Sequence, residues 1–240
     1  MKKPLPILFM SLIFIMHVTH AQEFIPASQL PEIPLSASDL ESFIPVGWEL
    51  IKTVSGDLDL LPGQETAMVI QKKHVNNPEL EAEAAESPTQ SERDRILIIL
   101  TSSESGNFFR VSQSEHIIFS DSGWSSSTDP FHSLEIKDNN LIVNFKGKTV
   151  KASWEIRYSF KFITDAFYLA HAFSTGKSEI ESFSYEYYPF SGELNYEFSE
   201  TDSSTKKHKD KKQHRLAEIP RLDNFVPLSL VIDENEGIIF

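Results

Sequence analysis

Apolar and polar residues alternate strictly over residues 154–162 (WEIRYSFKF). A β-strand places successive side chains on opposite faces, so this segment predicts a strand with one buried and one solvated face. The expected buried face consists of Trp154, Ile156, Tyr158, Phe160 and Phe162. Shorter alternations at 141–145 and 194–198 repeat the pattern, and aromatic-rich segments at 167–172 and 183–190 predict two further strands.

Two continuous apolar runs, 67–71 and 96–100 (ILIIL), are typical of strands that are buried on both faces. Turn residues at 138–140 and 191–192 separate the expected strands. Strands that recur at short intervals without a long amphipathic helix predict an all-β fold, mainly antiparallel. The pattern leaves open whether these strands form a meander, a sandwich or a propeller-like sheet.

The N-terminal part of the expected domain is irregular. Residues 22–37 contain three prolines and predict an extended leader. Ser38 and Glu41 have the spacing of a capping box, which predicts a short helix that Pro45 ends. We therefore expect a single β-rich domain over residues 38–240.

Two charged stretches interrupt this domain. Residues 76–95 carry six acidic side chains and predict a solvated insertion, helical or disordered. Residues 205–215 (TKKHKDKKQHR) are basic, and we expect a flexible loop over 201–217. A basic cluster can also bind an anionic membrane or nucleic acid, but this one has no interleaved aromatic residues.

The first 21 residues have the pattern of a secretory signal peptide. Lys2 and Lys3 precede an apolar run at 5–16, and small residues lead to a cleavage site between Ala21 and Gln22. The alternative is a membrane anchor, but a spanning helix needs about 20 apolar residues and this run is shorter. The sequence therefore predicts an exported protein, periplasmic or secreted, without a transmembrane segment.

The net charge and the absence of cysteine exclude several classes of function. The formal net charge of −13 argues against a general nucleic-acid binder, which needs clustered Lys and Arg to neutralise phosphates. The chain has no cysteine, which excludes a disulfide scaffold, a thiolate zinc site, a cysteine nucleophile and a lipoprotein anchor. An exported protein without disulfides depends on burial for its stability.

Catalytic motifs are sparse. Gly147-Lys148-Thr149 and Gly176-Lys177-Ser178 resemble the end of a phosphate-binding loop, but each lacks the preceding glycine of that motif, so we expect hairpin turns. The histidines show no metal-ligand spacing, and no nucleophile elbow occurs. Dispersed carboxylates remain, among them Asp121, Asp129 and Glu155.

One acidic loop is more specific. Residues 56–65 (GDLDLLPGQE) precede an expected strand, and Asp57, Asp59 and Glu65 match the first, third and ninth positions of a calcium loop. Leu61 replaces the fifth ligand and Pro62 replaces the usual glycine. These changes weaken the prediction of a calcium site. We hypothesise that this loop keeps its shape without an ion, with Pro62-Gly63 forming the turn.

From about Ile44 to Phe240 the chain resembles a family of exported bacterial proteins described as FG-GAP-like or VCBS-repeat-containing. The resemblance rests on the acidic loop and on the order and spacing of several short segments: 43–49 (FIPVGWE), 95–100, 129–131 (DPF), 134–136, 141–147, 154–162, 167–169 and 191–193. Relatives tend to have Gly-Gly-Ser where this chain has Gly147-Lys148-Thr149. The resemblance implies export and a β fold, and it brings no established activity.

Two function classes remain. The first is a non-enzymatic binding module of the cell envelope that contacts a protein, a glycan or an ion through its sheet face or its loops. Trp124, in a Ser-rich loop, is its candidate contact, and the alternative is a ring packed under its own loop. The second class is an exported hydrolase that uses dispersed carboxylates.

Overall fold

The computed structural model describes residues 30–73, 94–120, 129–200, 207–234 and 237–240. The expected signal peptide, the first half of the leader, most of the acidic insertion and the loop with Asp121 and Trp124 lie outside the described residues. Within the described ranges, no helix has the length and apolar character needed to cross a bilayer.

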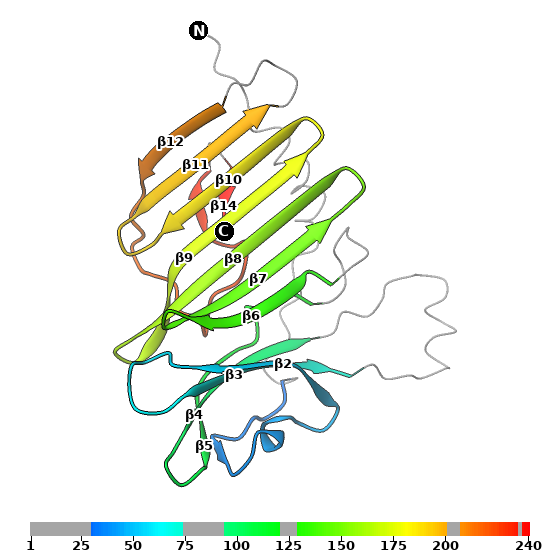
Figure 1. The fold of residues 1–240 in the computed structure, drawn as a ribbon, viewed down its shortest axis with the longest axis vertical. Coiled ribbons are helices and arrows are strands. Elements are labelled where there is room, and N and C mark those ends of the chain that lie inside the picture. The colour runs from blue at the N-terminus through cyan, green and yellow to red at the C-terminus, as the bar shows by residue number, and fades with distance from the viewer. Residues whose placement is uncertain (1–29, 74–93, 121–128, 201–206, 235–236) are drawn as a thin grey trace, which may run out of the picture.

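The described strands form two antiparallel sheets and a small C-terminal hairpin (Figure 1). Sheet A has the order β1 (Ser36–Ala37), β5 (Phe108–Ser114), β4 (Arg95–Ser102), β3 (Glu65–Lys72) and β2 (Trp48–Gly56). Sheet B has the order β12 (Lys207–Gln213), β11 (Glu193–Glu200), β10 (Glu181–Tyr188), β9 (Ala166–Ser178), β8 (Ala152–Ile163), β7 (Asn140–Lys148) and β6 (Phe131–Lys137). The hairpin pairs β13 (Val231–Asp233) with β14 (Ile238–Ile239). The prediction of an all-β, antiparallel fold is confirmed, and the strands follow one another as meanders.

The two sheets meet where β2 runs beside β6, as Figure 1 shows. A Cβ atom on Gly56 of β2 would lie 2.7 Å from the side chain of Ile136 on β6, so the absence of a side chain allows this close approach. The larger hydrophobic core contains residues of both sheets and of the C-terminal segment. A second, smaller core lies on the other side of sheet A.

The predicted alternation of residues 154–162 is present in β8. Ile156, Tyr158 and Phe160 are buried, while Trp154 and Phe162 are partly buried against the same core. The C-terminal segment covers this inner face of sheet B, and it lies behind the sheet in Figure 1. The centre of its Phe225 ring lies 4.9 Å from the centre of the Tyr158 ring and 5.7 Å from that of Phe160.

The two Gly-Lys motifs are not hairpin turns, which corrects the sequence prediction. Gly147 lies in β7 opposite Trp154, and Gly176 lies in β9 opposite Phe183. A Cβ atom would approach the Trp154 ring to 2.2 Å at Gly147 and the Phe183 ring to 2.3 Å at Gly176. The glycines therefore make room for cross-strand aromatic rings, a requirement of packing that no local turn signal reveals.

The segment after the leader also differs from its prediction. The expected short helix is a single 3-10 turn at Glu41–Phe43. Its N-cap is Leu40, which makes no side-chain capping bond, and Ser38 does not cap it. Asp39 Oδ1 accepts hydrogen bonds from the Ser42 amide at 2.9 Å and from the Ser42 hydroxyl at 2.7 Å. These bonds to Ser42 lower the pKa of Asp39 below its ordinary value. A run this short has no room for the reciprocal bond of a capping box.

The basic stretch forms an edge strand where the sequence predicts a flexible loop. Residues of β12 pair with β11 from Ser199↔Lys207 to Glu193↔Gln213. Lys211 lies 2.7 Å from Glu193, and Lys209 lies 4.0 Å from Glu197. The positive charges therefore complement acidic residues on the neighbouring strand, which explains an ordered strand of low apolar content.

Candidate functional site

The acidic loop between β2 and β3 brings the three predicted carboxylates together. One oxygen from each of Asp57, Asp59 and Glu65 lies within 4.8 Å of the others. Glu65 is buried at the start of β3, Asp59 is partly buried, and Asp57 is exposed. The sequence pattern therefore located a real cluster of oxygen ligands.

Each of these carboxylates already accepts hydrogen bonds from the loop. Asp57 accepts from the Leu60 amide at 2.8 Å, and Asp59 accepts from the Leu61 amide at 2.8 Å. The two oxygens of Glu65 accept from the Leu58 amide at 2.7 Å and from the Thr101 hydroxyl at 3.4 Å. A calcium ion needs six to eight oxygens, and these three carboxylates supply only part of that set.

The backbone of the loop shows how the turn is made. Leu60 has a φ of 64° and Gly63 has a φ of 134°. Leu60 is an uncommon residue in this left-handed region, and the bond from its amide to Asp57 helps to hold it there. The chain therefore turns at Leu60 as well as at Pro62-Gly63, where the hypothesis placed the whole turn.

The loop also joins the two sheets. Leu58 is buried in the larger core. Asn139, in the β6–β7 turn, donates from its side-chain Nδ2 to the backbone carbonyl of Asp57 at 3.0 Å. Asn139 itself has a φ of 57°, which asparagine tolerates better than most residues. The loop thus has a structural role at the junction of the sheets that does not depend on an ion.

Two of the carboxylates proposed for a hydrolase, Asp129 and Glu155, line one cleft of about 510 Å³, but basic side chains already engage both of them. Asp121 lies outside the described residues, as does Trp124. Asp129 accepts two hydrogen bonds from the Arg95 guanidinium, at 2.8 and 2.5 Å. Glu155 is 3.0 Å from Arg157 and 3.6 Å from Lys146.

Arg95 is the centre of a buried polar network that sequence reasoning missed. Its side chain is 2% exposed and donates to Gln71 at 2.7 Å and to the Phe119 carbonyl at 2.9 Å, besides Asp129. Its guanidinium also lies 5.8 Å from the centre of the Phe131 ring. These contacts join β4 of sheet A to the start of β6 in sheet B. Nothing in the local sequence signals the pairing of Arg95 with Asp129, because the two residues are 34 positions apart.

The face of sheet B opposite the core, here called the outer face, carries a connected set of polar side chains. Arg157 donates to Asn144 at 3.1 Å and to Glu155 at 3.0 Å, and it lies over the Phe173 ring at 5.1 Å. Asn144 continues the set by donating to Ser133 at 2.8 Å. The alternation in β8 predicted Glu155 and Arg157 on this face, and the cross-strand register supplied their partners.

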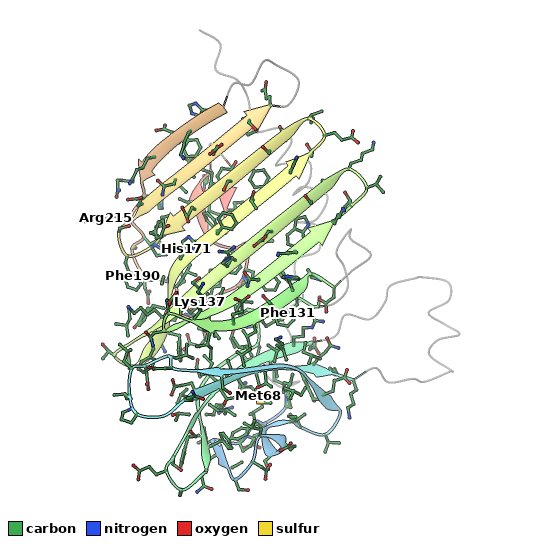
Figure 2. The ribbon with its side chains drawn as sticks, viewed as in Figure 1. Met68, Phe131, Lys137, His171, Phe190 and Arg215 are labelled. Atoms are coloured by element: carbon green, nitrogen blue, oxygen red, sulfur yellow. The ribbon has the colours of Figure 1, made fainter. Side chains whose placement is uncertain are left out.

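A second group on the outer face surrounds His171, which Figure 2 labels midway along sheet B. His171 Nε2 is 3.1 Å from Glu186, and its ring lies 4.8 Å from that of Tyr188. Burial lowers the pKa of His171, whereas the charge of Glu186 and its hydrogen bond act in the opposite direction. Burial also raises the pKa of Tyr188, so both rings are neutral near pH 7.

No protein-family model matches the chain, and no curated protein or solved structure matches it significantly.

Proposed function

We propose that this protein is an exported, non-enzymatic binding module of the cell envelope that contacts a protein or glycan through the outer face of sheet B. The observation that carries the proposal is the hydrogen-bonded polar side chains of this outer face, which lie around Phe173 and His171. Within the described ranges the C-terminal segment covers only the inner face, so the outer face of seven strands stays open (Figure 1).

The chemistry of this face suits recognition better than catalysis. Four of its polar side chains are only 20–39% exposed: His171, Glu186, Glu155 and Arg157. Their mutual bonds fix their rotamers before a partner arrives, which reduces the entropic cost of binding. The hydrolase alternative has less support, because Asp129 and Glu155 are already engaged by arginines.

Export and the family resemblance are parts of the same proposal. The signal peptide predicts an N-terminus at or near Gln22, and mass spectrometry of protein from an envelope fraction tests this directly. A retained Met1 in a cytosolic fraction would contradict export. The FG-GAP-like resemblance supports an envelope location and adds no activity.

A photo-crosslinking amino acid tests the binding face. It replaces Glu186 on the outer face in one variant and the exposed Lys52 of sheet A in a matched control. We expect an envelope protein to crosslink through position 186 and not through position 52. Crosslinking through position 52 alone would show that the binding surface is elsewhere.

A glycan array tests the second kind of partner. Arg157→Ser combined with Phe173→Ser removes the centre of the outer face, and Lys52→Ser serves as the control. We expect glycan binding, if a glycan is the partner, to be lost in the double variant and kept in the control. Both variants are first checked for an unchanged fold by circular dichroism.

A further inference from the structure

A separate cleft of about 400 Å³ lies where four segments meet: the residues just before β1, β5 of sheet A, the β8–β9 turn and the C-terminal segment around Arg221. Its charged lining consists of Arg110, Arg221, Asp165 and Asp223. Its volume is in the range of sites that hold small molecules. None of the residues discussed for the outer face lines this cleft.

Arg221 is the most informative residue of the cleft. Its Nη2 lies 2.8 Å from Asp223, but its Nε atom is buried and has no hydrogen-bond partner among the described residues. A buried donor without a partner is costly, and native proteins rarely keep one without a reason. Because this Nε has almost no solvent-accessible surface, a ligand in the cleft contacts other atoms of the Arg221 side chain, which is 39% exposed.

The backbone holds Arg221 in place. It forms a β-bridge with Tyr168, flanked by bonds from Leu169 N to Pro220 O and from Leu222 N to Phe167 O, both of 2.9 Å. The guanidinium is therefore presented by a paired segment and not by a free loop. Such preorganisation favours a defined binding geometry.

The cleft offers both signs of charge beside apolar surface. Arg110 also lines the cleft, is partly buried and donates to Gln113. Asp165 and Asp223 are exposed, and Asp223 is paired with Arg221. Val111 is 46% exposed and Leu35 is 71% exposed, so an apolar group can pack there. A simple anion would be repelled by the two aspartates, and a simple cation by the two arginines.

We infer that this cleft binds a zwitterionic ligand: an amino acid or a short peptide with a free carboxylate, a free ammonium group and an apolar side chain. The carboxylate accepts from the guanidinium groups of Arg221 and Arg110, because guanidinium groups match carboxylate geometry. The ammonium group lies by Asp165 and Asp223. The apolar side chain packs on Val111 and Leu35.

Isothermal titration calorimetry of the chain from Gln22 to Phe240 tests this inference. The probes are leucine, alanyl-leucine and alanyl-alanyl-leucine, each also in N-acetylated and C-amidated form. We expect saturable binding of at least one free probe and loss of binding when either end is blocked. The three lengths distinguish a free amino acid from a peptide.

Variants locate the site. Arg221→Gln removes the carboxylate partner and Asp165→Asn removes an ammonium partner at an exposed turn, where folding is not at risk. We expect each to weaken binding by about tenfold or more, since hydrogen bonds to charged groups are among the strong ones. Lys161→Gln, an exposed change outside the cleft, should leave the affinity unchanged.

Three results would overturn the inference: no binding of any free probe, equal binding of the blocked forms, or equal binding of acetate or inorganic phosphate. The last result would make the cleft a site for simple anions. The outer face contributes none of the residues discussed for it to this cleft. A negative result here therefore does not bear on the proposed function, which its own experiments test.

Discussion

Two adjacent residues of β8, Phe160 and Lys161, should contribute very differently to the free energy of unfolding. Phe160 is 0% exposed and packs against Phe225, whereas Lys161 points to solvent from the other face of β8. Phe160→Ala should lower the free energy of unfolding by roughly 3–5 kcal/mol, because it leaves a cavity in the core. Lys161→Ala should change it by less than about 0.5 kcal/mol. Denaturant melts measure both, and two equally mild effects would mean that the assigned faces are wrong.

His171 should make stability depend on pH. Burial lowers its pKa in the folded protein below the ordinary value of 6.5, so the folded state binds fewer protons than the unfolded state just below pH 6.5. Stability should therefore fall as the pH drops from 6.5 through the folded-state pKa, and His171 should contribute no pH dependence above 6.5.

The test compares melting temperatures at about pH 7.5 and about pH 5.5 for the wild type and His171→Gln. We expect the variant to lose less stability on acidification than the wild type. His132→Gln, at an exposed position of β6, is the matched control and should behave like the wild type. An identical pH dependence in all three proteins would contradict the assignment.

At the scale of elements, the acidic loop and β12 show how charge can replace apolar packing. In the loop, carboxylates accept hydrogen bonds from three backbone amides, of which one, that of Leu58, is buried. In β12, lysines lie across from the glutamates of β11. A charged edge strand also resists pairing with other chains, so this sheet edge is protected from aggregation.

Calcium should have little effect on the stability of the loop. Its amide donors already satisfy Asp57, Asp59 and Glu65, so we expect the same melting temperature in millimolar calcium and in excess chelator. Binding at 100 times the dissociation constant would add about 2.7 kcal/mol, which a thermal melt detects. A rise of several degrees that disappears in Asp57→Ala would contradict this and favour a calcium-stabilised binding module.

At the scale of the whole molecule, the Arg95 network should hold the sheets together. Asp129→Ala would leave the buried Arg95 charge without its carboxylate. We expect a loss of roughly 2–3 kcal/mol, below the value for a fully buried pair because Asp129 is 43% exposed.

A double variant separates charge from packing. Replacing the pair by Arg95→Met and Asp129→Leu removes both charges and should recover much of the lost stability, because no uncompensated buried charge remains. Urea melts of the wild type and both variants provide the measurement. Equal stability of the wild type and Asp129→Ala would show that the pair does not join the sheets.

The sequence by itself determined many of the strands and much of which face each strand buries, although it predicted a loop where β12 forms. The alternation in residues 154–162 and the apolar run at 96–100 are properties of contiguous residues, and the period of a strand makes them readable. The acidic loop was found for the same reason, since its three carboxylates fall within nine residues. Local signals succeed where the physical cause is local.

Only the tertiary structure decided the features that depend on which strands are neighbours. Gly147 is explained by the Trp154 ring on the next strand, Lys211 by Glu193, and Arg95 by Asp129. The cleft around Arg221 joins four segments whose sequences give no sign of one another. Register and sheet order are set by burial summed over the whole core, so a residue whose role is to complement a distant neighbour carries no signal in its own surroundings.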